Sequence, residues 1–198
     1  MKKLQEEPTW DDYYRNEEVE KMHWYYKDLD PDLKEAIAKL GINKGRFLDV
    51  GTGPGTQAVE LAKMGFDVTG SDISLTAIEK AKKLSDKVKF IVDDILKSKI
   101  PEKSFDYIFD RGFFHTLKGD DRKRYIEIVY NMLSENGILF LKTFSTKQEE
   151  SQGPVRYSKE DIEQLFSSKF TLEDAKETVY QGPSKNYPKS IFCILKKK

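Results

Sequence analysis

The sequence predicts an α/β fold in which a mostly parallel sheet carries helices on both faces. Short apolar runs alternate with helical periodicity, a glycine-rich turn follows the first run, and two strand-like runs come one after the other near the C-terminus. Alternation of strands and helices is typical of parallel sheets. Two successive strand-like runs indicate an antiparallel hairpin at the sheet edge. The 198 residues suffice for one domain.

The expected strands and helices are bounded by capping and turn residues. The strands are Arg46–Val50, Asp67–Ser71, Val88–Val92, Phe105–Phe109, Ile138–Phe144, Phe170–Tyr180 and Ser190–Leu195. The helices are one capped by Thr9, one from Asp30 that ends at Gly41, Thr56–Met64, one capped by Ser74, Asp120–Leu133 and one from Ser158 through Phe166. Asn136 and Gly137 are expected to close the fifth helix.

Composition disfavours several classes of protein. Lysine and arginine number 34, and so do aspartate and glutamate, so no net field would attract nucleic acid or an anionic membrane. No apolar run approaches the roughly 20 residues of a membrane span, and no signal-peptide core is visible. By default we expect a small-molecule substrate, a cytoplasmic location, and a monomer or homodimer.

Metal ligands are not clustered in the sequence. Cys193 is the one cysteine, and its apolar surroundings predict a buried strand position. Asp93 and Asp94 are adjacent at a strand end, so their side chains should point to opposite faces. We therefore expect no metal site.

A glycine-rich turn occupies the segment from Asp49 to Thr56, directly after the first strand. It contains Gly51, Gly53 and Gly55. Glycines there allow positive φ and close approach of a ligand, and the following helix presents free N–H groups. Ligands of open α/β sheets bind at the carboxyl ends of strands near a reversal in strand order. The whole turn, Thr52 and Thr56 included, is the predicted binding site.

The spacing of the glycines distinguishes this turn from a dinucleotide site. A dinucleotide fingerprint reads G-x-G-x-x-G. Here the sixth position is Thr56, and Pro54 interrupts the turn. An NAD-dependent oxidoreductase is therefore the less favoured interpretation. A purely structural turn would need the same glycines.

Two carboxylates on the following strands extend the predicted site toward a nucleoside. Asp72 ends the second strand, about 20 residues past the turn, where it could accept hydrogen bonds from both ribose hydroxyls. Asp94 follows the third strand and could accept the amino group of an adenine. Ile73 and Ile95 would then pack against the ring.

This order of features resembles the class I S-adenosylmethionine-dependent methyltransferase family. The family's first motif matches Asp49, Gly51, Gly53 and Gly55, its ribose acid matches Asp72, and its adenine-side acid matches Asp94. The resemblance implies a Rossmann-like, seven-stranded sheet with an antiparallel last strand. It also implies S-adenosyl-L-methionine as the cofactor.

A finer resemblance involves the exit of the fourth strand. The segment from Asp110 to Leu117 is similar to thiopurine-methyltransferase-like and tellurite-resistance-type enzymes, which act on small, soft nucleophiles such as thiols. The aromatic residues near the N-terminus look like the lid of those enzymes. One domain is expected, with residues 1–29 as a helical lid and residues 30–198 as the core.

The candidate catalytic group is His115, which follows the fourth strand and could act as a general base. Arg111 could bind the carboxylate of the cofactor's methionine, or pair with Asp110. The loop between Thr146 and Tyr157 could shape a substrate pocket. The candidate substrate residues are Trp24, Tyr25, Phe114 and Tyr157.

Two further interpretations stay open. A methyltransferase of macromolecules is disfavoured by the balanced charge and by the lack of a proline-containing loop after the fourth strand. A protein that binds the cofactor without catalysis is compatible with the same residues.

Overall fold

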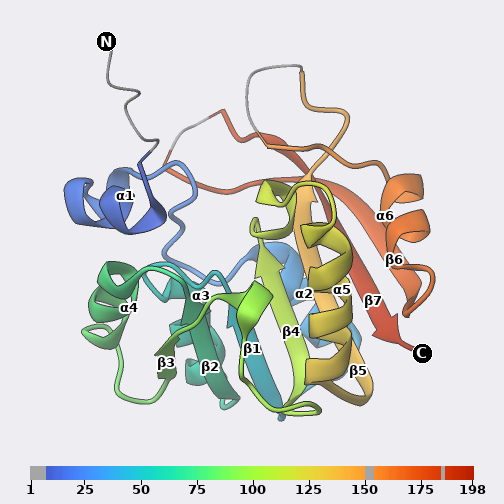
Figure 1. Ribbon diagram of the computed structural model, residues 1–198, viewed down its shortest axis with the longest axis horizontal. Coiled ribbons are helices and arrows are strands. Elements are labelled where there is room, and N and C mark those ends of the chain that lie inside the picture. The colour runs from blue at the N-terminus through green and yellow to red at the C-terminus, as the bar shows by residue number, and fades with distance from the viewer. Residues whose placement is uncertain (1–7, 150–153, 184–185) are drawn as a thin grey trace.

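The computed structural model describes residues 8–149, 154–183 and 186–198. Seven strands form one sheet in the order β3-β2-β1-β4-β5-β7-β6 (Figure 1). β7 pairs antiparallel with both of its neighbours, and every other pair is parallel. The strands are β1 (Arg46–Val50), β2 (Asp67–Asp72), β3 (Lys89–Val92), β4 (Phe105–Arg111), β5 (Leu133–Phe144), β6 (Phe170–Val179) and β7 (Lys189–Lys197). The predicted fold class is confirmed.

The helices begin at the capping residues that the sequence predicts. Thr9 and Ser158 form capping boxes with the aspartates three residues later, and the Ser74 hydroxyl accepts the N–H of Ala77. The α-helices are α1 (Trp10–Asn16), α2 (Pro31–Lys39), α3 (Thr56–Lys63), α4 (Leu75–Lys82), α5 (Asp121–Met132) and α6 (Lys159–Phe166). The short 3₁₀ turns are η1 (Val19–Lys21), η2 (Ile95–Lys97) and η3 (Phe114–Thr116).

One predicted boundary is wrong. Helix α5 ends at Met132 and the chain enters β5 at once, so Asn136 and Gly137 do not close the helix. Asn136 has a φ of +63°, and the register between β4 and β5 shifts at this point. The turn-forming pair therefore belongs to an irregularity within the strand, which re-aligns the chain before regular pairing begins at Ile138.

Both faces of the sheet are covered by buried apolar side chains. The face under α2, α3 and α4 is packed with residues such as Leu33, Leu61 and Ile78. The face under α5 and α6 is packed with residues such as Val129 and Phe166. Because β1 lies between β2 and β4, the chain runs outward to β3 and then crosses back to β4. Because β1, β2 and β4 are parallel, their carboxyl ends lie at one end of the sheet, and ligands of such sheets bind there, at the reversal in strand order.

Two smaller observations complete the fold. Cys193 is fully buried in β7, and burial raises the pKa of its thiol to about 12. No helix of the described part of the chain is long and apolar enough to cross a bilayer.

Gly55 is a packing requirement of the fold, and this is testable. It has a φ of +84°, and a Cβ there would lie 2.7 Å from the ring of Phe90 and 2.8 Å from the Cβ of Ala81. We expect Gly55→Ala to lower the free energy of unfolding by about 2–4 kcal/mol, from backbone strain plus overpacking. Urea denaturation measures this loss.

The matched control is Gly41→Ala. Gly41 has a φ of +64° but nothing lies within 4 Å of its added Cβ. That variant should lose only the backbone term of about 1–2 kcal/mol. Equal losses in the two variants would contradict the packing role of Gly55.

Candidate active site

The glycine turn connects the carboxyl end of β1 to the start of α3. Gly51, Gly53 and Gly55 all have positive φ, of +63°, +53° and +84°. A Cβ on Gly53 would lie 2.5 Å from the hydroxyl oxygen of Tyr14, and one on Gly51 would lie 3.4 Å from the Cβ of Phe113. The turn is therefore approached closely by α1 on one side and by the exit of β4 on the other.

Asp49 is the buried carboxylate beneath this turn. It is 2% exposed, and the hydroxyl of Thr52 donates to its Oδ2 at 2.5 Å. Burial raises the pKa of Asp49 to about 7, and the hydrogen bond from Thr52 opposes that shift. The nearby carboxyl of Asp110 raises the pKa further. A cationic ligand group would therefore be stabilised beside Asp49.

Asp72 orders the other side of the turn. Its Oδ2 accepts the N–H of Gly53 at 2.9 Å, and its Oδ1 accepts the N–H of Ser74 at 2.9 Å. The helix cap is supplied by Ser74, so Asp72 is not needed for that purpose. Burial is the main reason that the pKa of Asp72 is raised. Each carboxylate oxygen keeps a lone pair for a ligand hydroxyl.

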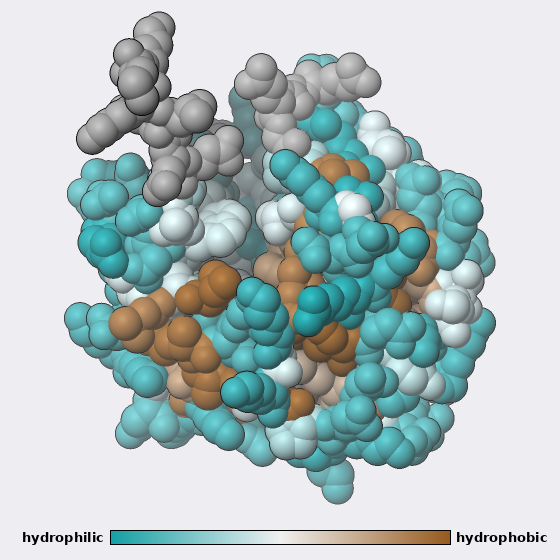
Figure 2. All heavy atoms as spheres, in the orientation of Figure 1, coloured by the Kyte–Doolittle hydropathy of each residue, from teal (hydrophilic) through white to brown (hydrophobic). Residues whose placement is uncertain are grey.

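Asp93 and Asp94 follow the end of β3, near an apolar surface. Asp94 accepts the N–H of Leu96 at 3.1 Å, as the cap of η2. Asp93, which the sequence analysis considered only as a metal ligand, has a buried Oδ2 without a hydrogen-bond partner among the described residues. Ile73 is 53% exposed, whereas Ile95 is buried. Figure 2 shows hydrophobic surface over this region of α4 and β3; the large exposed apolar residues there are Ile73, Leu75, Leu84 and Val92.

Asp110 shapes the exit of β4 from beneath. It has no exposed surface and accepts the N–H groups of Gly112, Phe113 and Phe114 and the hydroxyl of Tyr125 at 2.7 Å. Burial raises its pKa to about 6. Asp110 does not pair with Arg111, so that sequence-based alternative is wrong. Its hydrogen bonds instead fix the turn that carries Phe113 against Gly51.

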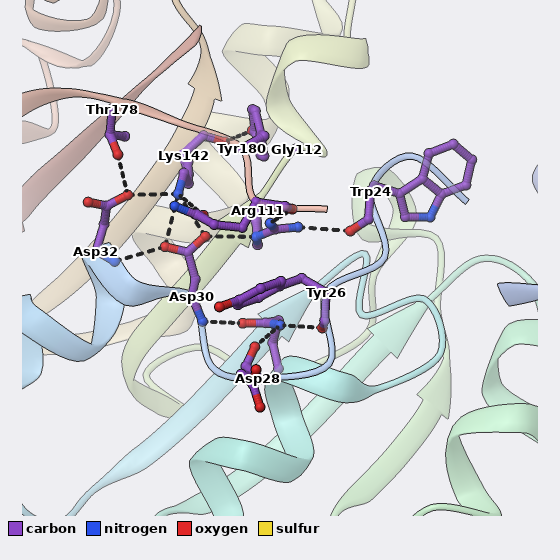
Figure 3. Close-up of polar contacts among 12 residues, drawn as sticks. Trp24, Tyr26, Asp28, Asp30, Asp32, Arg111, Gly112, Lys142, Thr178 and Tyr180 are labelled. Atoms are coloured by element: carbon purple, nitrogen blue, oxygen red, sulfur yellow. Dashed lines mark hydrogen bonds and ion pairs between the residues drawn. The ribbon is translucent and has the colours of Figure 1, made fainter. Parts of the chain in front are cut away.

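Arg111 points toward the N-terminal segment (Figure 3). Its Nε donates to Asp30 at 2.8 Å, its Nη1 to the carbonyl of Trp24 at 2.9 Å and its Nη2 to the carbonyl of Gln181 at 2.7 Å. The side chain is 7% exposed. Contact of Arg111 with the cofactor's carboxylate stays a prediction, and the observed bonds join the guanidinium to one carboxylate and two backbone carbonyls of the protein itself.

Lys142 is the buried centre of this cluster, and sequence reasoning missed it. It lies near the carboxyl end of β5 with no exposed surface, 2.8 Å from Asp30 and 2.7 Å from Asp32. Its ammonium also donates to Gln181 at 3.0 Å, and the hydroxyl of Tyr180 donates to its carbonyl. The sequence feature that could have indicated this buried charge is a single lysine within the apolar run Ile138–Phe144.

The N-terminal segment, defined here as residues 10–30, is fastened over the edge of the sheet. Gln57 of α3 donates to the carbonyls of Tyr26 and Asp28, at 3.1 and 2.9 Å, and accepts the N–H of Asp30 at 2.8 Å. At the other end, Tyr14 is 4% exposed, and the indole N–H of Trp24 donates to its hydroxyl at 3.2 Å. Burial raises the pKa of Tyr14, so the hydroxyl stays protonated.

His115 lies beside Gly112 at the exit of β4. Its ring stacks on Phe144 at 4.5 Å and meets Tyr180 edge-on at 5.9 Å. Nδ1 is buried without a hydrogen-bond partner among the described residues. Burial lowers the pKa of His115 to about 4, so the imidazole is neutral near pH 7.

The structure assigns two of the candidate substrate residues to the core. Phe114 has no exposed surface and packs against Tyr125, Tyr157 and Phe166. Tyr157 is 3% exposed and borders a groove of about 700 Å³ between α5 and α6, on the opposite face from α2. The turn after β4 directs Phe114 inward, and the segment before α6 directs Tyr157 against it, which periodicity could not predict. Part of the loop before Tyr157, residues 150–153, lies outside the described residues.

The other two candidates lie in the N-terminal segment. Trp24 is 37% exposed and contacts Trp10 at 5.8 Å between ring centroids. Tyr25 packs on a small cluster that contains Tyr14, Met22 and Ala77. Among the described residues, no group of three or more histidine, cysteine or acidic side chains could hold a metal ion.

These residues fit an S-adenosyl cofactor. The glycines let the turn lie against the carboxyl end of β2, and Asp72 offers lone pairs to ribose hydroxyls. Asp93, whose Oδ2 has no partner among the described residues, donates its backbone N–H to the carbonyl of Asp72 at 2.9 Å. A cationic group would be stabilised near the buried carboxyl of Asp49. These carboxylates, which accept hydrogen bonds and attract positive charge, therefore suit a nucleoside joined to a cation.

Comparison with known proteins gives the family. A family model described as a methyltransferase domain matches residues 43–192, so the chain belongs to that family. An uncharacterised methyltransferase of Schizosaccharomyces pombe is 32% identical over 130 residues, which are 62% of this chain and 90% of that protein. The protein is therefore an S-adenosylmethionine-dependent methyltransferase.

Two further similar proteins differ in the acceptor that their names imply. Human EEF1A lysine methyltransferase 2 is 31% identical over 137 residues, covering 63% of this chain and 58% of that protein. A structure described as the conversion of a disulfide bond into a thioacetal group during echinomycin biosynthesis has a TM-score of 0.81. It is 24% identical and covers 95% of this chain and 91% of that chain, which shows the shared fold.

The role of Asp72 can be tested by binding. We expect Asp72→Ala to weaken binding of S-adenosylhomocysteine roughly 10- to 100-fold, because charged hydrogen bonds to the ribose are lost. Calorimetric titration measures the affinity. Asp67→Asn, at the exposed opposite end of β2, is the control and should change the affinity less than about twofold. An unchanged affinity in Asp72→Ala would overturn the ribose assignment.

Proposed function

We propose that the protein methylates a small-molecule acceptor with a soft nucleophile, a thiol in the first instance. The acceptor would lie beside Gly112 and His115, under the N-terminal segment, which acts as a lid. The observation that carries the proposal is the buried, neutral His115, whose Nδ1 has no partner among the described residues. The resemblance to thiopurine- and tellurite-type enzymes agrees with such an acceptor.

The pKa of His115 limits which acceptors it can serve. A base with a pKa of about 4 is weak, so it assists a nucleophile that ionises readily and serves an alcohol or an ammonium poorly. A thiol, with an ordinary pKa of about 8.5, needs the least help. His115 would take the acceptor proton at a ring nitrogen and return it to solvent.

The surroundings of the site favour transfer of a charged methyl group. S-adenosylmethionine, when bound, supplies the methyl group on a sulfonium, whose carbon–sulfur bond breaks as the acceptor–carbon bond forms. The charge of the sulfonium is lost in that step, so a dry site favours the transition state. Phe144 and Tyr180 pack against His115, which is buried, and Tyr14 of the N-terminal segment covers Gly53 of the glycine turn.

A protein acceptor is the second candidate, and it is favoured by the relative named EEF1A lysine methyltransferase 2. A lysine ammonium has an ordinary pKa of about 10.4, so its deprotonation would need a stronger base than His115.

Two expectations from the sequence stay predictions. They are the location of the protein in the cytoplasm and the division of the chain into a lid, residues 1–29, and a core, residues 30–198.

The class of acceptor can be decided by following the methyl group. The purified protein is incubated with methyl-labelled S-adenosylmethionine and a cell extract, which is then separated into acid-precipitable protein and small molecules. The proposal expects the label in the small-molecule fraction, with added low-molecular-weight thiols raising it. Label confined to the protein fraction would overturn the proposed acceptor and support the second candidate.

The role of His115 can be tested with His115→Gln. With the acceptor found above, we expect kcat to fall about 100-fold while KM for S-adenosylmethionine stays nearly constant, because the base acts only in the chemical step. The wild-type contribution of His115 should not change between pH 8 and pH 5.5, since its pKa is about 4 and the neutral form persists there.

The control is His23→Gln, which replaces the chain's other histidine at an exposed position. That variant should keep the wild-type kcat. A wild-type kcat in His115→Gln would remove His115 from the mechanism.

A further inference from the structure

Three contacts join Arg111 to the glycine turn through the N-terminal segment. Arg111 Nη1 donates to the carbonyl of Trp24 at 2.9 Å, as Figure 3 shows. The indole of Trp24 donates to the hydroxyl of Tyr14 at 3.2 Å. That hydroxyl lies 2.5 Å from the position that a Cβ of Gly53 would take. The guanidinium is thus connected to the cofactor turn without touching it.

We propose that Arg111 is a positioning residue that retains the cofactor by acting through Trp24 and Tyr14. Arg111 holds the carbonyl of Trp24, Trp24 holds the hydroxyl of Tyr14, and Tyr14 covers Gly53. The proposal is an alternative to the sequence-based prediction that Arg111 binds the methionine carboxylate of the cofactor. The inference uses the S-adenosyl site at the glycine turn and is independent of the acceptor and of His115.

The geometry of Arg111 explains why a guanidinium is needed. Its fork is held by Asp30 at Nε and by the carbonyl of Gln181 at Nη2, and it lies over the rings of Tyr26 and Tyr180 at 5.8 and 5.3 Å. A lysine would keep the charge beside Asp30, but its single ammonium cannot also reach both carbonyls in this planar arrangement. Arg111→Lys should therefore loosen the part of the N-terminal segment around Trp24, while the charges of Asp30 and Lys142 stay balanced.

The outer end of the segment has a separate anchor. The carboxylate of Asp11 accepts the hydroxyl of Ser74 and the N–H of Thr76, each at 2.8 Å, and Lys80 donates to the carbonyl of Tyr14 at 2.5 Å. These contacts attach α1 to α4 without Arg111. Loss of Arg111 should therefore release Trp24, and with it the hydrogen bond that orients the Tyr14 hydroxyl over Gly53, while α1 stays attached to α4.

Two ligands separate the positioning role from direct contact. S-adenosylhomocysteine carries an amino-acid carboxylate, and 5′-methylthioadenosine lacks it. If Arg111 positions the cover, Arg111→Lys should weaken both ligands by the same factor, about tenfold, the usual effect of a lost hydrogen bond from a charged donor. If Arg111 binds the carboxylate, the variant should weaken only S-adenosylhomocysteine. That second result would overturn the proposal.

A double-mutant cycle tests the path through Tyr14. Tyr14→Phe removes one hydroxyl and leaves the ion pairs of Arg111 intact, so it should weaken both ligands as well. In the double variant Arg111→Lys with Tyr14→Phe, the proposal expects no further loss, because the two residues act in series. Losses that multiply would show independent roles and overturn the proposal, as would wild-type affinity in Tyr14→Phe.

The free protein gives a readout that requires no ligand. Trp10 and Trp24 are the chain's two tryptophans, and both lie in the N-terminal segment. Arg111→Lys should shift their emission to longer wavelength, whereas Arg46→Lys should not. Arg46 is the matched control because it forms a two-point ion pair with Asp106 at the amino ends of β1 and β4, far from the glycine turn. An unshifted emission in Arg111→Lys would contradict the loosening of the cover.

Discussion

The ammonium of Lys142 has no exposed surface, and the arrangement of the active-site edge depends on the two carboxylates that compensate it. A buried charge without a partner would cost several kcal/mol, so Asp30 and Asp32 must lie against β5. Both residues start α2, more than 100 positions earlier in the chain. The pairing therefore brings the N-terminal segment to the carboxyl edge of the sheet, over the glycine turn.

The same cluster contributes more to geometry than to net stability. Replacement of buried ion pairs by apolar groups is often neutral or stabilising, whereas removal of one partner is costly. Asp30 fixes one arrangement of three elements, because its carboxylate accepts from both Arg111 of β4 and Lys142 of β5. Tyr180 joins this cluster to the neutral His115, because it contacts Arg111, Lys142 and the imidazole ring. The compensated charges and the buried imidazole therefore lie together at the carboxyl end of the sheet.

The sequence predicted the parts of the site that are local. The glycine turn, Asp72 and the capping serine at position 74 are each defined within a few residues, and their places in the fold could be predicted from spacing. Lys142, Gln57 and Tyr14 could not be placed in this way, since their partners come from other elements. Phe114 was misassigned because burial depends on how Asp110 folds the turn after β4. Asn136 was misassigned because a helix stop and a strand bulge use the same residue types.

Hydrogen exchange of backbone amides, with and without S-adenosylhomocysteine, tests most directly the claim that the N-terminal segment covers the cofactor. The account predicts that ligand binding slows exchange both in the glycine turn, residues 51–56, and in the described segment, residues 10–30. Protection of the turn with unchanged exchange in residues 10–30 would contradict the account, because the cofactor would then bind without the cover.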